Sequence, residues 1–494
     1  MSERNVGIVR AEVYLPRFRM TAGTIGWNRA TQRVVANYDE DAQTMAVAAA
    51  RACLAGWWGD DRDRVDALFA ASTTFPQMEK SAAAFIAVAS DLRQDAFTAD
   101  VTSSLRAGTV ALGMAADRVA AGHSDCALVV ASDLRLVEPE SEAEAWCGDA
   151  AAAVLVGTGD AIAVIRGSAH VADELYGLWR GEGERWVRSW EERFVAEEGF
   201  LRAVRMVADE LRERGFDPAD ADRVVIAAPD PRRHRDAARV LGVPRERLVD
   251  PFFGLLGNTG TSFVLVQLVA ALENAEPGQR ILVVNWGDGA DAWLLQVTEE
   301  IRAWQVGRVP IRRRLEDGLV VRSYNEYLKW RGLAAGGQPV RQGSVSASAL
   351  HRETDEVLRL RGTRCPDCGA VSYPPQRGCP ECRSFAQPTS VPLADERGEV
   401  FTYAMDYITP GVDVPLVLTV VDLANGARLV LFMTDRDIEE VRIGMPVDLR
   451  LRLSHTAGSM RSYYWKAVPA RGAPGGDATP RVAADGRKPV SAGG

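Results

Sequence analysis

The sequence predicts an α/β fold built from two similar halves, followed by a cysteine-rich metal-binding module and a small all-β barrel. The first part rests on short apolar runs that alternate with helical segments up to residue 299 and then repeat in order. The second part rests on four cysteines within 18 residues, after which the pattern becomes that of β-strands.

The repeat appears as two series of segments in the same order. In the first half we expect strands at 65–71, 97–101, 127–132 and 150–156, with helices at 81–92 and 107–121. In the second half, matching segments lie at 223–229, 250–260, 262–273, 280–285 and 287–292. The two segments of the last matching pair are separated by fewer residues than those of the earlier pairs, which places an extra loop at 133–147 in the first half. The repeat predicts two α/β halves, about 1–160 and 161–299, in one domain; two unrelated α/β domains are the alternative.

The composition fits a chain of two or three globular domains. With 494 residues, 47% of them hydrophobic, the protein is too long for one ordinary core and too apolar to be disordered throughout. The net charge of −9 argues against general nucleic-acid binding, because phosphate contacts need clustered cations. The sequence has no apolar run of about 18 residues and no apolar leader, so we expect no membrane span and a cytoplasmic protein.

The rest of the chain divides into four segments. We expect a linker with a docking helix (300–350, helix 323–331), the cysteine-rich module (351–390), a small barrel (391–468) and a disordered tail (469–494). The expected barrel strands lie at 400–404, 416–421, 429–432 and 447–451. Asn425-Gly426 is a strong hairpin signal between two of them, and about five short strands fit an OB-like barrel.

The clustered cysteines predict a metal site. Cys365, Cys368, Cys379 and Cys382 form two CxxC pairs separated by ten residues. Two-residue spacing lets both thiolates of a pair reach one ion, and four thiolates complete a tetrahedral shell. This donor set favours zinc, with iron in a rubredoxin-like site as the alternative. Because no position is left for water, the ion is expected to be structural.

Three stretches carry a resemblance to a known family: 100–112 (DVTSSLRAGTVAL), 148–155 (GDAAAAVL) and 257–262 (GNTGTS). Together they resemble the thiolase superfamily, and within it hydroxymethylglutaryl-CoA synthase and β-ketoacyl-ACP synthase III. The zinc ribbon and barrel, preceded by a docking helix, resemble the zinc-ribbon/OB-fold acyl-CoA-associated proteins that accompany thiolase-superfamily enzymes. The resemblance implies a five-layered αβαβα fold, an obligate dimer, a coenzyme A thioester as substrate or ligand, and a possible partner thiolase.

The resemblance also shows which chemistry is missing. The family passes an acyl group to a cysteine at the N-terminus of a buried helix, where the helix end favours the thiolate. Leu105 occupies the matching position and has no nucleophilic atom. Thr73 or Thr74 replaces the family's Glu, Pro229 or Asp230 replaces its His, and Asn258 stands where the family has Asn. Asn258 and Asp230 are therefore the candidate catalytic residues, with a surface or capping role as the alternative for Asp230.

No other nucleophile stands out in the sequence. Cys53, Cys126 and Cys147 are expected to be ordinary buried thiols. Ser103 and Ser104 adjoin the vacated position but have no neighbouring base in the sequence.

Two further sets of basic residues have competing interpretations. His234 lies about one helical turn beyond the lost histidine, but arginines flank it, so a solvated helix face is expected. The arginines at 308 and 312–314 could meet the phosphates of coenzyme A, with a solvated linker as the alternative.

Three functional interpretations follow. In the first, the protein binds an acyl-CoA and makes or breaks a C–C bond without an acyl-cysteine, since aldol and retro-aldol steps need only a base and an oxyanion site. In the second, it is a noncatalytic partner that binds or channels a thioester for an active thiolase. In the third, catalysis uses a residue that the sequence does not reveal. We favour the first, in a homodimer.

Overall fold

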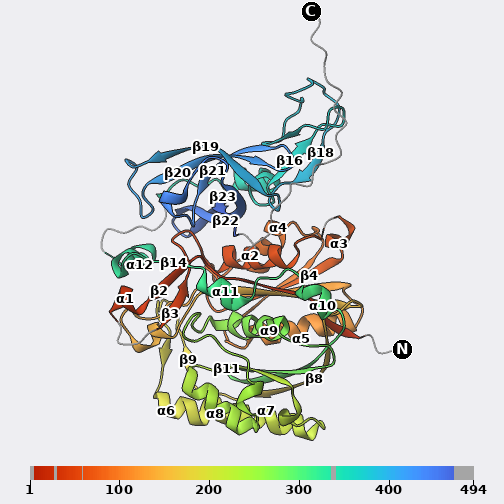
Figure 1. Ribbon diagram of the computed structural model, residues 1–494, viewed down its shortest axis with the longest axis vertical. Coiled ribbons are helices and arrows are strands. Elements are labelled where there is room, and N and C mark those ends of the chain that lie inside the picture. Colours follow the sequence, from red (N-terminus) through yellow and green to blue (C-terminus); the bar gives the residue numbers. More distant parts are fainter. Residues whose placement is uncertain (1–4, 27–30, 58, 335–340, 472–494) are drawn as a thin grey trace, which may run out of the picture.

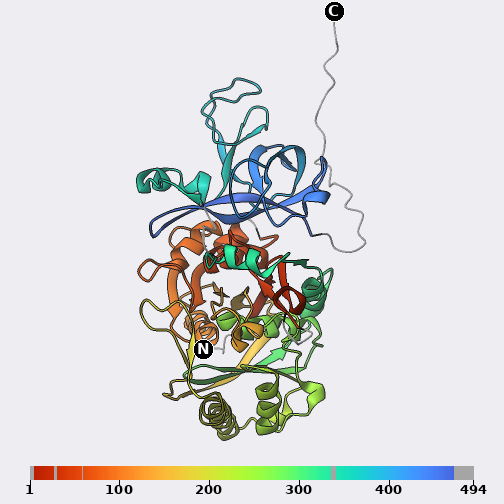
Figure 2. The same ribbon diagram turned by 90° about the vertical axis from the view of Figure 1, so that its left-hand side faces the viewer.

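The computed structural model describes residues 5–26, 31–57, 59–334 and 341–471. They form a large α/β domain with a small ribbon and a β-barrel stacked on it along the long axis (Figures 1 and 2). The part of the expected tail from residue 472 onward lies outside the described residues. No helix in the described ranges is long and apolar enough to cross a membrane.

A sheet of nine strands forms the framework of the α/β domain, in the order β11-β12-β13-β8-β1-β7-β6-β4-β5. The strands are β1 Val6–Tyr14, β4 Val65–Ser72, β5 Phe97–Thr102, β6 Cys126–Asp133, β7 Ala150–Thr158, β8 Ala163–Ala172, β11 Arg223–Ala227, β12 Arg280–Trp286 and β13 Gly289–Val297. The helices of this domain are α1 Ala22–Ile25, α2 Ala42–Cys53, α3 Asp60–Asp63, α4 Ala82–Ala89, α5 Ala107–Ala120, α6 Glu192–Phe194, α7 Arg202–Glu213, α8 Pro231–Leu241, α9 Phe263–Glu273 and α10 Ile301–Gln305.

The predicted duplication is present in the sheet. The sets β1-β7-β6-β4 and β8-β13-β12-β11 have the same order and the same strand directions. The counterpart of β5 is reduced to one bridge between Val224 and Leu248. The extra loop of the first half joins β6 to β7, whereas β12 and β13 are joined by a tight turn at Gly287.

The helices form three layers around the two half-sheets. Figure 1 shows α5 and α9 in the middle, between the half-sheet that holds β4 and the one that holds β8 and β11. The outer faces are covered by α2 and α4 on one side and by α7 and α8 on the other. Residues 263–272 of α9 are all buried, as expected for an apolar helix enclosed between two sheets. The five-layered αβαβα fold is therefore confirmed.

The segment after residue 300 packs on the α/β domain. It contains α11 Ile311–Glu316, β14 Leu319–Val320 and α12 Tyr324–Trp330. β14 extends a small sheet with β2 Phe18–Thr21 and β3 Gln32–Val35. In α12, capped by Ser323, the indole of Trp330 packs on Phe18 with ring centroids 4.7 Å apart. The helix expected at 323–331 thus anchors the chain before it enters the ribbon.

The ribbon and barrel follow. Their remaining elements are β15 Arg341–Gln342, α13 Ala347–Arg352, α14 Thr354–Val357, β16 Arg361–Arg364, β17 Val371–Ser372, β18 Thr389–Pro392, β19 Gly398–Asp406, β20 Leu416–Leu423, β21 Arg428–Met433, β22 Pro446–Ala457 and β23 Met460–Pro469. Strands β22, β19, β20, β21 and β23 pair in sequence, and β23 returns to β22, which closes the barrel. The hairpin predicted at Asn425-Gly426 joins β20 to β21, with Gly426 at φ 91°.

Buried charges join the barrel to the α/β domain. Arg452 of β22 is completely buried and lies 2.6 Å from Asp435, 3.1 Å from Glu40 and 3.6 Å from Asp39. Lys466 adds a contact of 2.8 Å to Asp39. Asp39 and Glu40 belong to the α/β domain, so this cluster crosses the interface between the two parts of the chain.

Candidate functional site

Leu105 lies in the tight connection between β5 and α5, one residue before the N-cap Arg106. The turn at Gly287 packs directly on this connection, since a Cβ on Gly287 would lie 2.8 Å from the nitrogen of Arg106. The carbonyl oxygen of Leu105 accepts a hydrogen bond of 3.4 Å from Nδ2 of Asn285. The position thus has the helix-terminus setting that lowers the pKa of a thiol, but it carries a hydrocarbon side chain.

A buried carboxylate that the sequence analysis missed lies where the end of β4 meets the segment that begins at Thr261. Asp133 ends β6, and its Oδ1 accepts hydrogen bonds from Ser72 Oγ (2.8 Å), Thr73 N (2.7 Å) and Thr74 Oγ1 (2.8 Å). Its Oδ2 accepts from the nitrogen of Thr261 at 2.8 Å. The threonines that replace the family's Glu are therefore engaged as donors to a carboxylate. The sequence does contain one signal for this site, because Asp133 is an acidic residue at the end of an otherwise apolar strand.

A second buried carboxylate, Asp291 of β13, supports the first turn of α5. Its Oδ2 accepts a hydrogen bond of 2.6 Å from Thr109 Oγ1, and its Oδ1 lies 2.8 Å from Nδ1 of His170. Arg106 is 3.6 Å away, and Asn285 donates to Thr109 at 3.1 Å. These contacts stabilise the first turn of α5, next to Leu105.

The two candidate catalytic residues lie on neighbouring segments. Asn258 pairs through its backbone with Cys147, and its Nδ2 donates to the carbonyl of Ala228 at 3.3 Å. Its Oδ1 accepts from the nitrogen of Gly260 at 2.9 Å. Asp230, two residues beyond Ala228, caps α8 and accepts two backbone hydrogen bonds on Oδ1. The cap accounts for one carboxylate oxygen, and a catalytic role for either residue stays a prediction.

His234 is buried, and the expectation that it lies on a solvated helix face is wrong. The buried residues of α8 are His234, Ala237, Ala238 and Leu241, one continuous helical face. The flanking arginines fall on the other faces of the helix. Burial lowers the pKa of His234 to about 4, so the ring is neutral near pH 7.

The three scattered cysteines remain thiols. Burial raises the pKa of Cys53 to about 12 and that of Cys126 to about 11. Burial also raises the pKa of Cys147, although the charges of Arg135 and Arg33 oppose it. Cys147 adjoins Asn258, so it is the thiol to examine for covalent chemistry.

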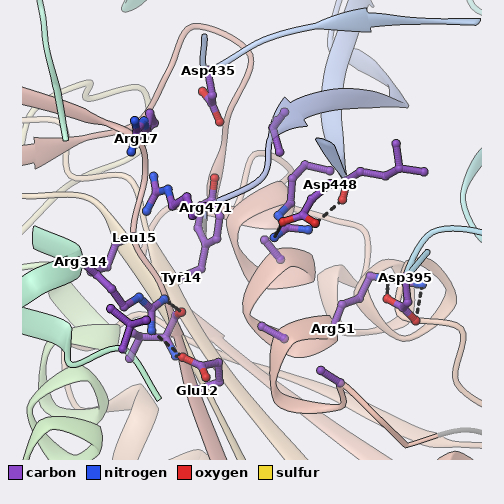
Figure 3. Close-up of a pocket in the computed structure, with 18 of the residues that line it drawn as sticks. Glu12, Tyr14, Leu15, Arg17, Arg51, Arg314, Asp395, Asp435, Asp448 and Arg471 are labelled. Atoms are coloured by element: carbon purple, nitrogen blue, oxygen red, sulfur yellow. Dashed lines mark hydrogen bonds and ion pairs between the residues drawn. The ribbon is translucent and has the colours of Figure 1, made fainter. Parts of the chain in front are cut away.

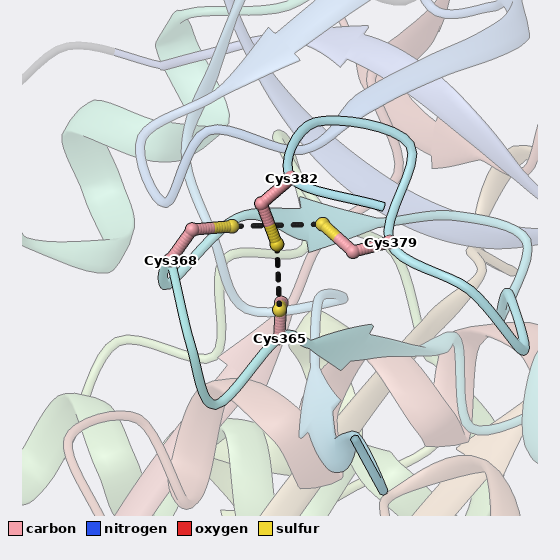
Figure 4. Close-up of side chains that lie close together, drawn as sticks. All are labelled: Cys365, Cys368, Cys379 and Cys382. Atoms are coloured by element: carbon pink, nitrogen blue, oxygen red, sulfur yellow. Dashed lines mark hydrogen bonds between the residues drawn. The ribbon is translucent and has the colours of Figure 1, made fainter. Parts of the chain in front are cut away.

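The four clustered cysteines meet at one point of the ribbon (Figure 4). Their sulfurs all lie within 4.8 Å of one another, with Cys365 to Cys382 at 3.6 Å and Cys368 to Cys379 at 3.5 Å. Tetrahedral zinc with Zn–S bonds of about 2.3 Å separates its thiolates by about 3.8 Å. The geometry therefore fits zinc held by four thiolates, with no position for water or substrate.

Comparison with known families supports this description of the C-terminal part. Residues 356–386 match the family model described as ChsH2, rubredoxin-like zinc ribbon domain. Residues 390–452 match the model described as ChsH2, C-terminal OB-fold domain. The zinc ribbon and the OB-like barrel expected from the sequence are both confirmed.

The α/β domain has relatives among known proteins. The hydroxymethylglutaryl-CoA synthase of Methanopyrus kandleri is 31% identical over 346 residues, which cover 67% of this chain and 98% of that protein. The Thermococcus sibiricus enzyme of the same name is 32% identical over 310 residues, covering 60% and 88%.

Solved structures show the same fold. The HMG synthase of the curacin biosynthetic pathway, solved with an acetyl donor-ACP, matches with a TM-score of 0.60 and 20% identity, covering 71% of this chain and 94% of that one. MvaS in complex with 3-hydroxy-3-methylglutaryl coenzyme A matches with a TM-score of 0.57 and 20% identity, covering 69% and 95%.

Proposed function

The chain belongs to the hydroxymethylglutaryl-CoA synthase family, and from this membership we propose that it binds an acyl-CoA and makes or breaks a C–C bond without an acyl-cysteine. The single observation that carries the proposal is Leu105 at the N-terminus of α5. The relatives supply the substrate class, and the leucine removes the covalent step.

The remaining polar groups suit an aldol-type reaction. In the cleavage direction, a base takes the hydroxyl proton of a 3-hydroxyacyl thioester, the C–C bond breaks to release a carbonyl compound, and the electron pair moves onto the thioester oxygen to give an enolate. The protonated base then returns the proton to C2 of the enolate, which yields the shorter acyl thioester. Asn258 Nδ2 is the candidate donor to that oxygen, because its present bond to Ala228 is long, at 3.3 Å. Asp230 Oδ2 is the candidate base, since the helix cap occupies Oδ1, and Arg233 Nε lies 3.7 Å from this Oδ2.

A noncatalytic role is the second candidate function. It is favoured by the engagement of Thr73 and Thr74 with Asp133, which leaves no free carboxylate where the family has its Glu. In this role the protein would bind or channel a thioester for a partner thiolase.

We also propose that the protein is a homodimer. β5 is the last strand of the nine-stranded sheet, so one of its edges pairs with no other strand of that sheet. Phe97 of β5 and Val110 and Met114 of α5 are exposed apolar residues beside this edge. A second copy would cover them.

The decisive experiment separates the covalent step from turnover. The full-length protein is incubated with radiolabelled acetyl-CoA and, separately, with a panel of 3-hydroxyacyl-CoA thioesters. We expect release of a carbonyl product with at least one thioester and no stable acyl-protein. A labelled peptide containing Cys147 would overturn the absence of an acyl-cysteine.

Two substitutions then distinguish the enzyme from the scaffold. Asn258→Ala and Asp230→Ala are expected to lower turnover while thioester binding persists. Asn274→Ala at the C-terminal end of α9 and Asp236→Ala on α8 serve as matched controls. Thioester binding by the unaltered protein without turnover of any thioester would favour the noncatalytic role.

A further inference from the structure

A cavity of about 810 Å³ lies between the α/β domain and the barrel. Its walls come from β1, α2, the segment around α11, and the barrel strands β22 and β23. Leu105, Asp230 and Asn258 do not line it. The cavity is therefore separate from the strand-end site, and its volume is that of a pocket for a small molecule.

The lining has an excess of arginine, with eight arginines and six acidic residues. Several of the acids are already neutralised. Glu12 lies 2.9 Å from Arg308 and 2.7 Å from Arg314. Asp435 is engaged by Arg452, whose side chain lies outside the lining. Glu12 is thus shared by two arginines, and Asp435 is held chiefly by Arg452 while it also lies in the field of Arg471.

Three of the lining arginines, Arg313, Arg397 and Arg471, form no ion pair with any described residue. Arg17 is paired with Asp317 at 3.1 Å, but that carboxylate is 64% exposed and screened by solvent. Figure 3 shows Arg17, Arg471 and Arg314 one above another along one wall. Desolvation lowers the pKa of Arg471, and the like charges of Arg17 and Arg314 lower it further, whereas the carboxylate of Asp435 raises it. An anion in the cavity would relieve this repulsion.

A different part of the wall is apolar. Val47, Ala48, Ala52 and Ala55 of the α2 segment line the cavity with small side chains. Such a surface accommodates an uncharged organic group without leaving a buried polar atom unpaired.

We propose that this cavity binds a phosphate-bearing organic anion of nucleotide size, with its phosphates between Arg17, Arg313 and Arg471 and its organic part against α2. Guanidinium groups suit the role, because each presents a planar fork of donors to phosphate oxygens. The proposal does not require the strand-end site to be catalytic.

The test measures binding by isothermal titration calorimetry on the full-length, zinc-loaded protein. Adenosine 3′,5′-bisphosphate is the probe, with pyrophosphate as a probe lacking the organic part and adenosine as a probe lacking phosphate. We expect the bisphosphate to bind more tightly than either, and its affinity to fall as salt is raised. Failure of the unaltered protein to bind the bisphosphate at millimolar concentration would overturn the proposal.

Substitutions locate the site. Arg17→Ala combined with Arg471→Ala is expected to weaken bisphosphate binding at least about tenfold, because two charge-assisted contacts are lost. Arg428→Ala, which removes an exposed arginine on the far hairpin of the barrel, is the matched control. Unchanged affinity in the double variant, with circular dichroism showing that it is folded, would overturn the assignment.

The apolar wall has its own test. Ala52→Leu fills space beside α2. It is expected to lower the affinity for the bisphosphate at least about fivefold while leaving the affinity for pyrophosphate unchanged. Equal effects on the two probes would overturn the placement of the organic part. Because every readout is binding, a failure of this proposal is distinguishable from an absence of thioester turnover.

Discussion

Arg452→Met tests how the barrel is held on the α/β domain. The substitution keeps much of the side-chain volume but leaves Asp39, Glu40 and Asp435 buried together, with Lys466 as the neighbouring cation on Asp39. Removing one partner of a buried ion pair costs about 3–5 kcal/mol, because the remaining charge is uncompensated. For a barrel and ribbon of this size, that loss lowers the melting temperature of the affected transition by about 10 °C or more.

The same cluster predicts how the defect depends on pH. Burial raises the pKa of Glu40 to about 7, although Arg452 opposes the shift. A carboxyl with a raised folded-state pKa contributes stability that is fully present below about pH 4.5 and is lost as the pH rises through 7. Without Arg452 the pKa rises further, so the defect should be largest at pH 8 and smallest near pH 5.

Differential scanning calorimetry of the zinc-loaded protein at pH 5 and pH 8 measures both effects. Arg428→Met is the control, since its pair with Asp422 is exposed and screened by solvent. Adding Glu40→Gln to Arg452→Met should recover part of the loss at pH 8. A shift no larger than that of the control at pH 8 would refute the reasoning.

Four other predictions concern the site, the metal, the helix packing and the dimer. Leu105→Cys should place a thiol with a lowered pKa at the start of α5, so iodoacetamide at pH 7 should alkylate it faster than the buried native thiols; equal rates would contradict the helix-terminus argument. Purified protein should contain about one equivalent of zinc by mass spectrometry, and chelation should unfold the ribbon; finding neither zinc nor iron would exclude the metal site. Gly108→Ala should lower the urea midpoint, because a Cβ there would lie 2.5 Å from a backbone oxygen of Thr261, whereas Gly167→Ala meets nothing within 4 Å and should not disturb the packing. Met114→Lys should convert the proposed dimer to a monomer in light scattering, while Met460→Lys, an exposed change on the barrel, should not.

The parts of the fold that could be predicted are those with a local or periodic signal. The duplication is visible because each half repeats the same apolar runs, and the zinc site because all four ligands fall on two short loops. The proposed loss of the nucleophile could be inferred because Leu105 lies within 100–112, one of the stretches that carry the resemblance.

The parts that could not be predicted depend on contacts between distant segments. Arg452 and Glu40 are separated by more than 400 residues, and in sequence each resembles an ordinary solvated charge. The burial of His234 could not be predicted from its charged neighbours, because only the helical spacing of His234, Ala237, Ala238 and Leu241 indicates a buried face. Asp133 accepts several hydrogen bonds because two distant segments, one ending at Ser72 and one beginning at Thr261, meet at its carboxylate.

The placement of the linker connects these observations. Arg19 is almost completely buried and donates to the carbonyls of Arg314 and Leu315 at 2.9 and 2.8 Å. These bonds hold α11 against the α/β domain and so place the arginines of that segment, Arg313 among them, at the mouth of the cavity. Strands β22 and β23 of the barrel supply another part of the lining, and the same linker keeps the barrel tethered nearby, which lowers the entropic cost of bringing the two parts together. The cavity thus depends on the fusion of the two parts, whereas the strand-end site is built by the α/β domain alone.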